Sequence, residues 1–406
     1  MVGLEIGTSK VCAVVGESRP DGTIRILGVG QAPSRGVRKG EIVDFETAMK
    51  CVHEALADAE TKSDVMIRSV WVGVSGSHIQ SFNNRGSVTL PEDRDEIDDQ
   101  DIEDVKVNAR EISIPAPNTF LHSIIQHYHV DGQDGVLNPI GMLGNKLEAD
   151  FHVIHGVRTR FQNTIRCVKE LPLEVDDVVF TALASAQVVL TQHQKNMGAL
   201  VIDMGGGTTD YILYVDGAVK QSGCIGVGGD HITNDISMGL RIPMTRAEKL
   251  KVEEGSATLG NCLPGETVLL KDDSGFAGKE IDRETLNTII HLRVRETFEL
   301  LKRRLDEEPF LNYLGEGIFI TGGCSHLQGI EHLAQDVFEI PSRVAHAQRM
   351  SGLTSAVENP QFAAAIGLIK YAQAVQADRR PDRGFRRIFT KILGGMRFLL
   401  AFVSFA

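Results

Sequence analysis

The sequence lacks several features that would assign it to common classes of protein. No uncharged apolar run approaches the roughly 18–20 residues that a membrane-spanning helix needs, so no such helix is predicted. The first residues contain neither a basic segment nor an apolar one, which is not the pattern of a secretory signal. The six cysteines are isolated and form no CxxC pair, so neither a zinc ribbon nor a disulfide framework is predicted.

Two common nucleotide-binding patterns are also missing. There is no Walker A sequence, and no GxGxxG follows the first predicted strand, so P-loop and Rossmann folds are not favoured. An excess of positive charge is absent too, since the net charge of −12 argues against general binding of nucleic acid. That total hides a local difference. Residues 376–406 carry seven basic and two acidic side chains, or +5, which leaves −17 for the rest of the chain.

Two segments about two hundred residues apart follow the same plan. Residues 2–15 and 200–214 each contain an apolar strand that ends in an acid, then glycine with hydroxyl residues, then a second strand. The pattern predicts a tight β-hairpin in which glycine allows a positive φ or a close approach to a ligand. Because 406 residues suffice for two or more domains, we expect a duplicated α/β domain with a cleft between the copies.

Two further regions differ from this repeated plan. Residues 76–156 contain short strands and one helix among Gly, Pro and Asn, which predicts a small inserted domain. Residues 231–316 contain several helical patterns and predict a second insert, which a strand and Gly-rich turn at 317–325 follow. The expected elements are helices at 45–59 (capped by Asp44), 99–110, 245–254, 284–305 and 361–374, and strands at 69–74 and 121–130.

The paired hairpins suit the polyphosphate of a nucleotide. Backbone N–H groups beside glycine and the hydroxyls of threonine and serine can donate to phosphate oxygens, and Lys10 can neutralise phosphate charge. Glu5, Asp203 and Asp210 are placed to hold Mg²⁺ through its waters, and Asp203 is the candidate catalytic residue. The candidate phosphate-binding residues are Gly7, Thr8, Ser9, Lys10, Gly205, Gly206, Gly207, Thr208 and Thr209, and a flat purine could approach the backbone at Gly322 and Gly323.

Either hairpin taken alone would equally fit an ordinary glycine turn between two strands. With the third turn and in this order, they resemble the phosphate-1, phosphate-2 and adenosine motifs of the actin-like ATPase superfamily. The resemblance implies two RNase-H-like lobes around an ATP·Mg²⁺ cleft, and residues 178–190 and 362–371 are similar to its two connecting helices. It also implies contacts of Glu248 and Lys251 with ribose and adenine, although an exposed helix with ordinary charges would explain residues 247–251 as well.

Within that superfamily, the chain resembles the FtsA family of bacterial cell-division proteins over essentially its whole length. The residues that carry the resemblance are Gly3-Leu4-Glu5-Ile6-Gly7-Thr8 with Val11, Pro33-Ser34-Arg35-Gly36 with Lys39-Gly40, Ser75-Gly76 with His78-Ile79, and Asn138-Pro139 with Gly141 and Gly144. Glu5 replaces the Asp of most superfamily members, and its longer side chain should still reach the water shell of a metal. The implied divisions are subdomain 1A at 1–75, 157–198 and 359–375, subdomain 1C at 76–156, subdomain 2A at 199–230 and 317–358, subdomain 2B at 231–316, a linker at 376–384 and a membrane-targeting helix at 385–406.

The first connecting segment departs from the superfamily pattern. Actin and the chaperones place a Glu or Gln at its start to orient the attacking water, whereas residues 179–186 contain no carboxylate or amide in the expected place. Orienting water is a large part of catalysis in phosphoryl hydrolysis. We therefore expect firm nucleotide binding with slow or conditional ATP hydrolysis.

The end of the chain predicts an amphipathic helix that lies in a membrane surface. Apolar residues recur there at helical spacing, and four basic residues avoid that stripe. A terminal helix packed on the body is the alternative, but the polar linker before it and the local basic bias favour an anionic membrane. FtsA proteins end in such a linker and helix. The candidate membrane residues are Phe385, Arg386, Arg387, Ile388, Phe389, Lys391, Ile392, Leu393, Met396, Leu399, Leu400 and Val403.

The resemblance implies a peripheral protein on the cytoplasmic face of the inner membrane at the division septum. Such a protein would polymerise with ATP, recruit later divisome proteins and tether FtsZ, whose C-terminal tail docks on subdomain 2B. Arg293, Arg295, Lys302, Arg303 and Arg304 offer cations for that acidic tail, although a solvated helix face explains them equally well. A sugar or acetate kinase and a PilM-like pilus-assembly adaptor are the alternatives, and neither needs the basic tail.

Overall fold

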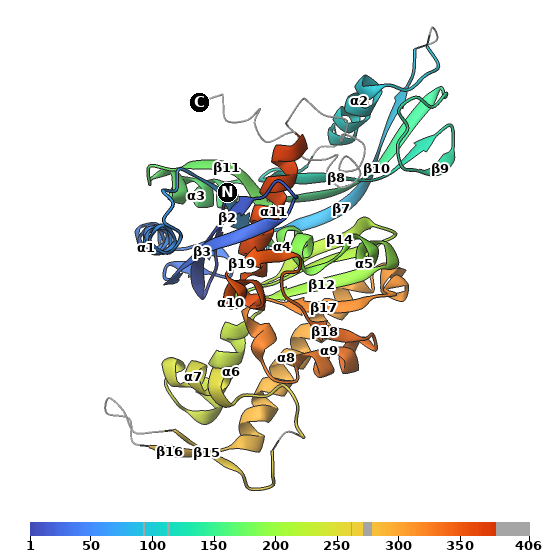
Figure 1. Cartoon of the computed structure of the whole chain (residues 1–406). Coiled ribbons are helices and arrows are strands. Elements are labelled where there is room, and N and C mark those ends of the chain that lie inside the picture. Colours follow the sequence, from blue (N-terminus) through green and yellow to red (C-terminus); the bar gives the residue numbers. More distant parts are fainter. Residues whose placement is uncertain (92–93, 112–113, 261, 271–277, 379–406) are drawn as a thin grey trace.

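The computed structural model describes residues 1–91, 94–111, 114–260, 262–270 and 278–378 (Figure 1). Within these residues, no helix combines the length and the apolar character that crossing a membrane requires. The predicted membrane-targeting helix at 385–406 lies outside the described residues. The last described helix, α11 (Ala363–Asp378), continues further than the predicted 361–374, so the first three residues of the predicted linker are helical.

The first lobe contains a mixed six-stranded sheet. Its strands are β1 (Val2–Ile6), β2 (Lys10–Ser18), β3 (Ile24–Pro33), β6 (Ser69–Val74), β11 (Glu174–Phe180) and β19 (Met350–Gly352). They lie in the order β11-β6-β1-β2-β3-β19, with β1, β2 and β3 antiparallel and with β6 and β11 parallel to β1. The helices and the short hairpin of this lobe are α1 (Phe45–Ser63), α3 (Arg158–Lys169), α4 (Thr181–Val189), α10 (Thr354–Val357), α11, β4 (Val37–Arg38) and β5 (Glu41–Ile42).

The second lobe repeats the plan in a five-stranded sheet. Its strands are β12 (Ala199–Met204), β13 (Thr209–Val215), β14 (Ala218–Ile225), β17 (Gly317–Thr321) and β18 (Ser342–Val344), in the order β14-β13-β12-β17-β18. As in the first lobe, three antiparallel strands are followed by two that run parallel to the first of them. This equivalence confirms the predicted duplicated α/β fold.

The second lobe carries its own helices and a small hairpin. Helices α6, α7, α8 and α9 pack their apolar residues into one core with β12, β13 and β17, and α6, α7 and α8 lie together below the sheet (Figure 1). These elements are α5 (Gln192–Met197), α6 (Gly229–Leu240), α7 (Met244–Glu254), α8 (Arg283–Leu305), α9 (Ile330–Phe338), β15 (Thr267–Leu270) and β16 (Lys279–Asp282), with 3₁₀ turns at Pro309–Tyr313, Gly323–His326 and Pro360–Phe362.

Helices α4 and α11 pack against each other between the two sheets. Gly367 of α11 makes this possible, because a Cβ atom there would lie 2.0 Å from the carbonyl oxygen of Ala184 in α4. The first connecting helix is shorter than the predicted 178–190. Val178 and Phe180 still pair with β6 as part of β11, so the helix begins only at Thr181.

An inserted sheet follows β6 of the first lobe. Its strands are β7 (Gln80–Thr89), β8 (Asn118–Val130), β9 (Gln133–Val136) and β10 (Lys146–Val157), which lie in the order β7-β10-β8-β9, and α2 (Asp99–Arg110) packs on β7 and β10. The helices predicted at 45–59, 99–110, 245–254 and 284–305 are confirmed. Asp44 caps α1 as expected, since its side chain accepts a hydrogen bond from Thr47 N.

The insert docks on the outer edge of β14 in the second lobe. Side chains, and not a paired strand, meet the edge backbone: Ser81 Oγ donates to Ser222 O (2.6 Å) and Gln126 Nε2 to Val219 O (2.6 Å). The buried ring of His152 lies between Asn83 and Ser222, 2.7 Å from the side-chain oxygen of each. Because the amide oxygen of Asn83 can only accept, Nδ1 of His152 donates and Nε2 accepts from the Ser222 hydroxyl.

Stability is expected to fall in mild acid because of this histidine. Burial lowers the pKa of His152 to about 3, whereas an unfolded histidine titrates near about 6.5. The contribution of neutral His152 to stability is therefore complete at pH values above the pKa of the unfolded state. It is lost as the pH falls toward the pKa of the folded state. When the pH is lowered from 7 to 5, we expect the free energy of unfolding in urea to fall by about 2 kcal/mol less for a His152→Asn variant than for the wild type. Equal losses in both proteins would contradict this account.

Candidate functional site

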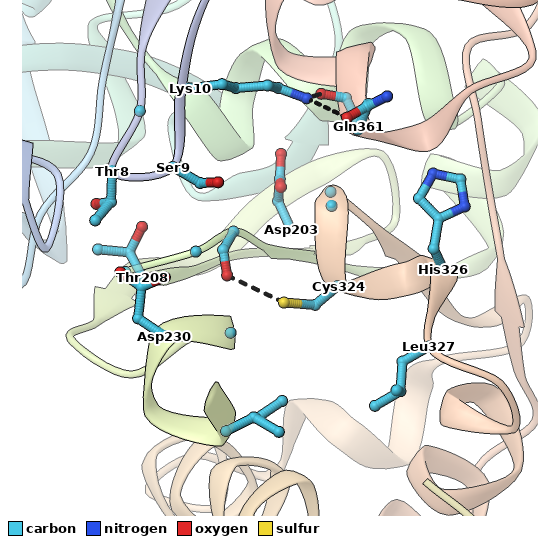
Figure 2. A pocket seen from close by; sticks show the side chains of 18 of the residues that line it. Thr8, Ser9, Lys10, Asp203, Thr208, Asp230, Cys324, His326, Leu327 and Gln361 are labelled. Carbon is cyan, nitrogen blue, oxygen red and sulfur yellow. Dashed lines mark hydrogen bonds between the residues drawn. The ribbon is translucent and has the colours of Figure 1, made fainter. Parts of the chain in front are cut away.

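The two predicted hairpin turns meet between the lobes. Each is closed by a backbone hydrogen bond of 2.9–3.0 Å, which the N–H of Gly7 donates in the first turn and that of Gly205 in the second. Thr8 and Ser9 approach the second turn from the other side (Figure 2). A Cβ atom on Gly207 would lie 2.4 Å from Thr8 Oγ1, so glycine is what lets the two turns come this close.

A cavity of about 560 Å³ opens between these turns and extends toward α7. This volume lies in the range of small-molecule sites. Thr209 is not part of the lining. Strand alternation turns it to the opposite side from Thr208 and Asp210, where its buried Oγ1 donates to Val227 O (2.8 Å), so its hydroxyl does not face the cavity as predicted. The other predicted nucleotide residues, Gly7, Thr8, Ser9, Lys10, Gly205, Gly206, Gly207, Thr208, Glu248, Lys251, Gly322 and Gly323, all line the cavity.

The three acids predicted to meet a metal also line the cavity. Burial raises the pKa of Glu5 and of Asp210 to about 7, and it raises the pKa of Asp203 as well. Glu5 Oε2 is buried without a hydrogen-bond partner, a costly state that a cation or its water would relieve. In the part of the chain that the structure describes, no three His, Cys, Asp or Glu side chains converge as direct ligands of an ion.

Lys10 points along the cavity and not at the turns. Its Nζ donates to the backbone O (3.0 Å) and to Oε1 (2.7 Å) of Gln361, and it lies 4.6 Å from the centre of the Phe362 ring (Figure 2). Burial lowers the pKa of Lys10, so these acceptors stabilise its ammonium group in a poorly solvated place. Nothing in the sequence near Lys10 indicated Gln361, which reaches it only through the fold.

Glu248 and Lys251 face the cavity as a pair on α7. Lys251 Nζ donates to Glu248 Oε2 (2.6 Å), Thr233 Oγ1 (2.9 Å) and Gly229 O (3.2 Å), and Thr233 also donates to the same oxygen of Glu248. One lysine thus holds α7 against the first turn of α6. Both side chains are close enough to the cavity for the predicted ribose and adenine contacts, which stay a prediction.

The start of α6 was missed in the sequence analysis. Its first N–H groups support the second turn, since Gly229 N donates to Gly205 O (3.0 Å) and Asp230 N to Gly206 O (2.7 Å). Gly229 and Asp230 both line the cavity, and burial raises the pKa of Asp230. The glycines at 226–229 directly before a helical pattern were the signal for a helix N-terminus at the site.

Hydroxyl groups of the first lobe bind the acids of the second. Thr181 Oγ1 donates to Asp210 Oδ2 (2.8 Å), and Ser185 Oγ donates to Asp203 Oδ2 (2.5 Å). Ser75 Oγ donates to the other carboxylate oxygen of Asp210 (2.7 Å). These contacts tie the two lobes together at the bottom of the cavity.

The cations proposed on α8 do not share one face. Arg293 pairs with Asp235 of α6 at 2.5 Å. Lys302 Nζ donates to Val337 O of α9 (2.8 Å), and Arg304 Nη1 donates to Cys224 O of β14 (3.0 Å). Because these residues turn toward three different elements, they form no single patch with the exposed Arg303. The predicted membrane residues lie outside the described part of the chain.

Known proteins resemble the chain over nearly its whole length. A family model described as "Cell division protein FtsA" matches residues 200–367, and one described as "SHS2 domain inserted in FTSA" matches residues 76–155. The chain is 38% identical to Cell division protein FtsA of Pseudomonas aeruginosa, over 93% of this chain and 90% of that protein. The Escherichia coli protein of the same name is 35% identical, over 92% of this chain and 90% of its own length.

Solved structures show the same fold at low identity. A PilM-PilN type IV pilus biogenesis complex matches with a TM-score of 0.65 and 16% identity, covering 92% of this chain and 98% of its own. MreB5 of Spiroplasma citri bound to ADP matches with a TM-score of 0.56 and 15% identity, covering 93% and 97%. The fold is therefore actin-like, and the chain belongs to the FtsA family of cell-division proteins.

Proposed function

We propose that the chain binds ATP with Mg²⁺ between its lobes, polymerises at the inner membrane and anchors FtsZ filaments there. The observation that carries the nucleotide part is the pair of glycine turns that face each other across one cavity. Their backbone N–H groups and the hydroxyls of Thr8, Ser9 and Thr208 supply the donors that phosphate oxygens need. The purine would lie toward Gly322, Gly323 and α7.

The residues at the bottom of the cavity suit hydrated Mg²⁺. Three carboxylates, one of them with an oxygen that lacks a partner, are hard acceptors for the water shell that this ion retains. Glu5, Asp203 and Asp210 would hold it, and the ion would neutralise phosphate charge. Lys10, whose Nζ is bound by Gln361, would add positive charge to the cavity that holds the phosphates.

ATP hydrolysis is proposed to be slow. Of the described residues of α4, only Thr181 lines the cavity, and it carries a hydroxyl where actin and the chaperones are expected to place an amide or a carboxylate. Asp203, the candidate catalytic residue, is bound by Ser185. The protein is thus proposed to use ATP for assembly more than for turnover.

The membrane and FtsZ parts of the proposal rest on family membership and on the C-terminal sequence. FtsA relatives are cell-division proteins, and residues 385–406 combine an apolar stripe with basic residues. The acidic tail of FtsZ is proposed to dock on the region 231–316, where α8 carries Arg293, Lys302, Arg303 and Arg304 on more than one face.

Vesicle co-sedimentation tests this function. With anionic vesicles and ATP·Mg²⁺, the full chain is expected to pellet, whereas a chain that ends at Ala377 is expected to stay in the supernatant. A full-length variant with Arg386→Glu and Arg387→Glu distinguishes the effect of charge from the effect of deleting the whole segment. Each basic residue near an anionic surface adds about 1 kcal/mol, so reversal of two charges should weaken binding more than tenfold.

Neutral vesicles are the control for the electrostatic part, and omission of ATP is the control for the nucleotide part. If the full chain and the chain ending at Ala377 both stay soluble with anionic vesicles, the membrane-anchor proposal is wrong. If the full chain pellets equally with and without ATP, the membrane-anchor proposal stands, but the proposed dependence of membrane binding on the nucleotide is wrong.

A further inference from the structure

Helix α4 presents two hydroxyls to the carboxylates at the bottom of the cavity. Thr181 and Ser185 are four residues apart and therefore share one face of the helix. Both are buried, with Thr181 only 5% exposed and Ser185 fully covered. Buried hydroxyls need partners. Here Thr181 donates to Asp210 and Ser185 donates to Asp203, and both acceptors are carboxylates of the second lobe.

Asp210 is bound on both of its oxygens. Thr181 donates to Oδ2, and Ser75, which directly follows β6, donates to Oδ1. Two donors that belong to the other lobe thus help to set the torsion of this carboxylate. Asp203 pairs directly with Asp210 in the β12–β13 ladder, so the two acids lie side by side and are bound from the same direction.

This arrangement differs from a purely structural use of the hydroxyls. A serine or threonine in a helix commonly donates to the carbonyl four residues earlier, as Thr164 Oγ1 does to Arg160 O in α3. Thr181 and Ser185 instead donate to carboxylates that line the cavity. Hydrated Mg²⁺ demands near-octahedral geometry, so the orientation of each carboxylate that meets its waters matters.

We propose that Thr181, Ser185 and Ser75 are positioning residues that aim Asp210 and Asp203 at the hydration shell of a nucleotide-bound Mg²⁺. The inference rests on the proposed binding of ATP, and it names the residues that determine how strongly this binding depends on Mg²⁺. Partners of metal-binding side chains commonly change metal affinity by about 10- to 100-fold when they are removed. Since these donors and acceptors lie on different lobes, Mg²⁺ would also favour the arrangement in which the lobes are held together.

The test compares ATP affinity with and without the metal. Calorimetric titration of the full-length protein with ATP would be carried out in excess Mg²⁺ and again in EDTA. Thr181→Val and Ser185→Ala are each expected to weaken binding about tenfold in Mg²⁺ and to leave binding in EDTA unchanged. Thr181→Ser retains the hydroxyl and should restore the Mg²⁺-dependent affinity. Thr164→Val, which removes a buried helix hydroxyl away from the cavity, is the matched control and should have no effect.

The outcomes separate this inference from the proposed function. Equal weakening of ATP binding in Mg²⁺ and in EDTA would mean that the hydroxyls only support the fold, and the inference would be wrong. Unchanged affinity in all three variants, including Ser75→Ala, would overturn it too. If the wild-type protein binds no ATP under either condition, the proposed nucleotide function itself fails.

Discussion

Replacing Gly207 with valine is expected to weaken ATP binding about 100-fold while the protein stays folded. The new Cβ atom would lie 2.4 Å from Thr8 Oγ1 and 2.9 Å from Thr8 Cβ. Rotation of Thr8 cannot relieve the second contact, and it would also break the hydrogen bond that Gly40 N donates to Thr8 Oγ1 (3.0 Å). The two turns must therefore separate, and the donors on one turn leave the phosphates that the other binds.

Calorimetric titration with ATP·Mg²⁺ measures this effect, and thermal unfolding monitors the fold. Gly260→Val is a suitable control, because a Cβ atom at Gly260 meets no atom within 4 Å. It should bind ATP like the wild type. Undiminished affinity in the Gly207 variant would mean that the spacing of the turns does not determine binding.

Replacing Gly367 with alanine is expected to destabilise the protein by about 3 kcal/mol. In an unconstrained helix the same change would stabilise by up to about 1 kcal/mol, because glycine is a poor helix former. At Gly367, however, the added atom would lie 2.0 Å from Ala184 O and 2.4 Å from the carbonyl carbon. These are backbone atoms, so α4 and α11 can accommodate it only by moving apart.

Urea unfolding of the variant measures the change in free energy. The matched control is Gly239→Ala in α6, where the added atom would meet the flexible end of Ile289 at 2.9 Å. That substitution should be neutral or stabilising, since the side chain can rotate away. A Gly367 variant as stable as the wild type would show that the two helices are not held at this distance by packing.

The glycine turns were predictable because their signal is local. An acid, glycines and hydroxyl residues between two apolar strands specify a tight hairpin within about ten residues, and two copies predict a duplicated fold. The structure confirms that fold and places Glu5, Asp203 and Asp210 at one cavity. The helix capped by Asp44 was predictable for the same reason.

Other features depended on contacts that sequence patterns do not carry. Gln361 and Lys10 lie far apart in the sequence, and only the packing of α11 beside β1 brings them together. The boundary at Thr181 was missed because an apolar run fits a buried strand and a buried helix equally well. The cations of α8 were grouped by closeness in sequence, although a rotation of about 100° per residue turns neighbours to different sides.

The docking of the insert has a consequence for the exposed edges of the second-lobe sheet. An open sheet edge invites strands from other chains, and side chains that occupy its backbone groups remove that risk. On β14 these groups are taken by Ser81, Asn83 and Gln126. A strand added to this sheet from a neighbouring molecule must therefore come at β18, which offers only three residues. Continuation of this sheet from one molecule to the next is therefore blocked at β14.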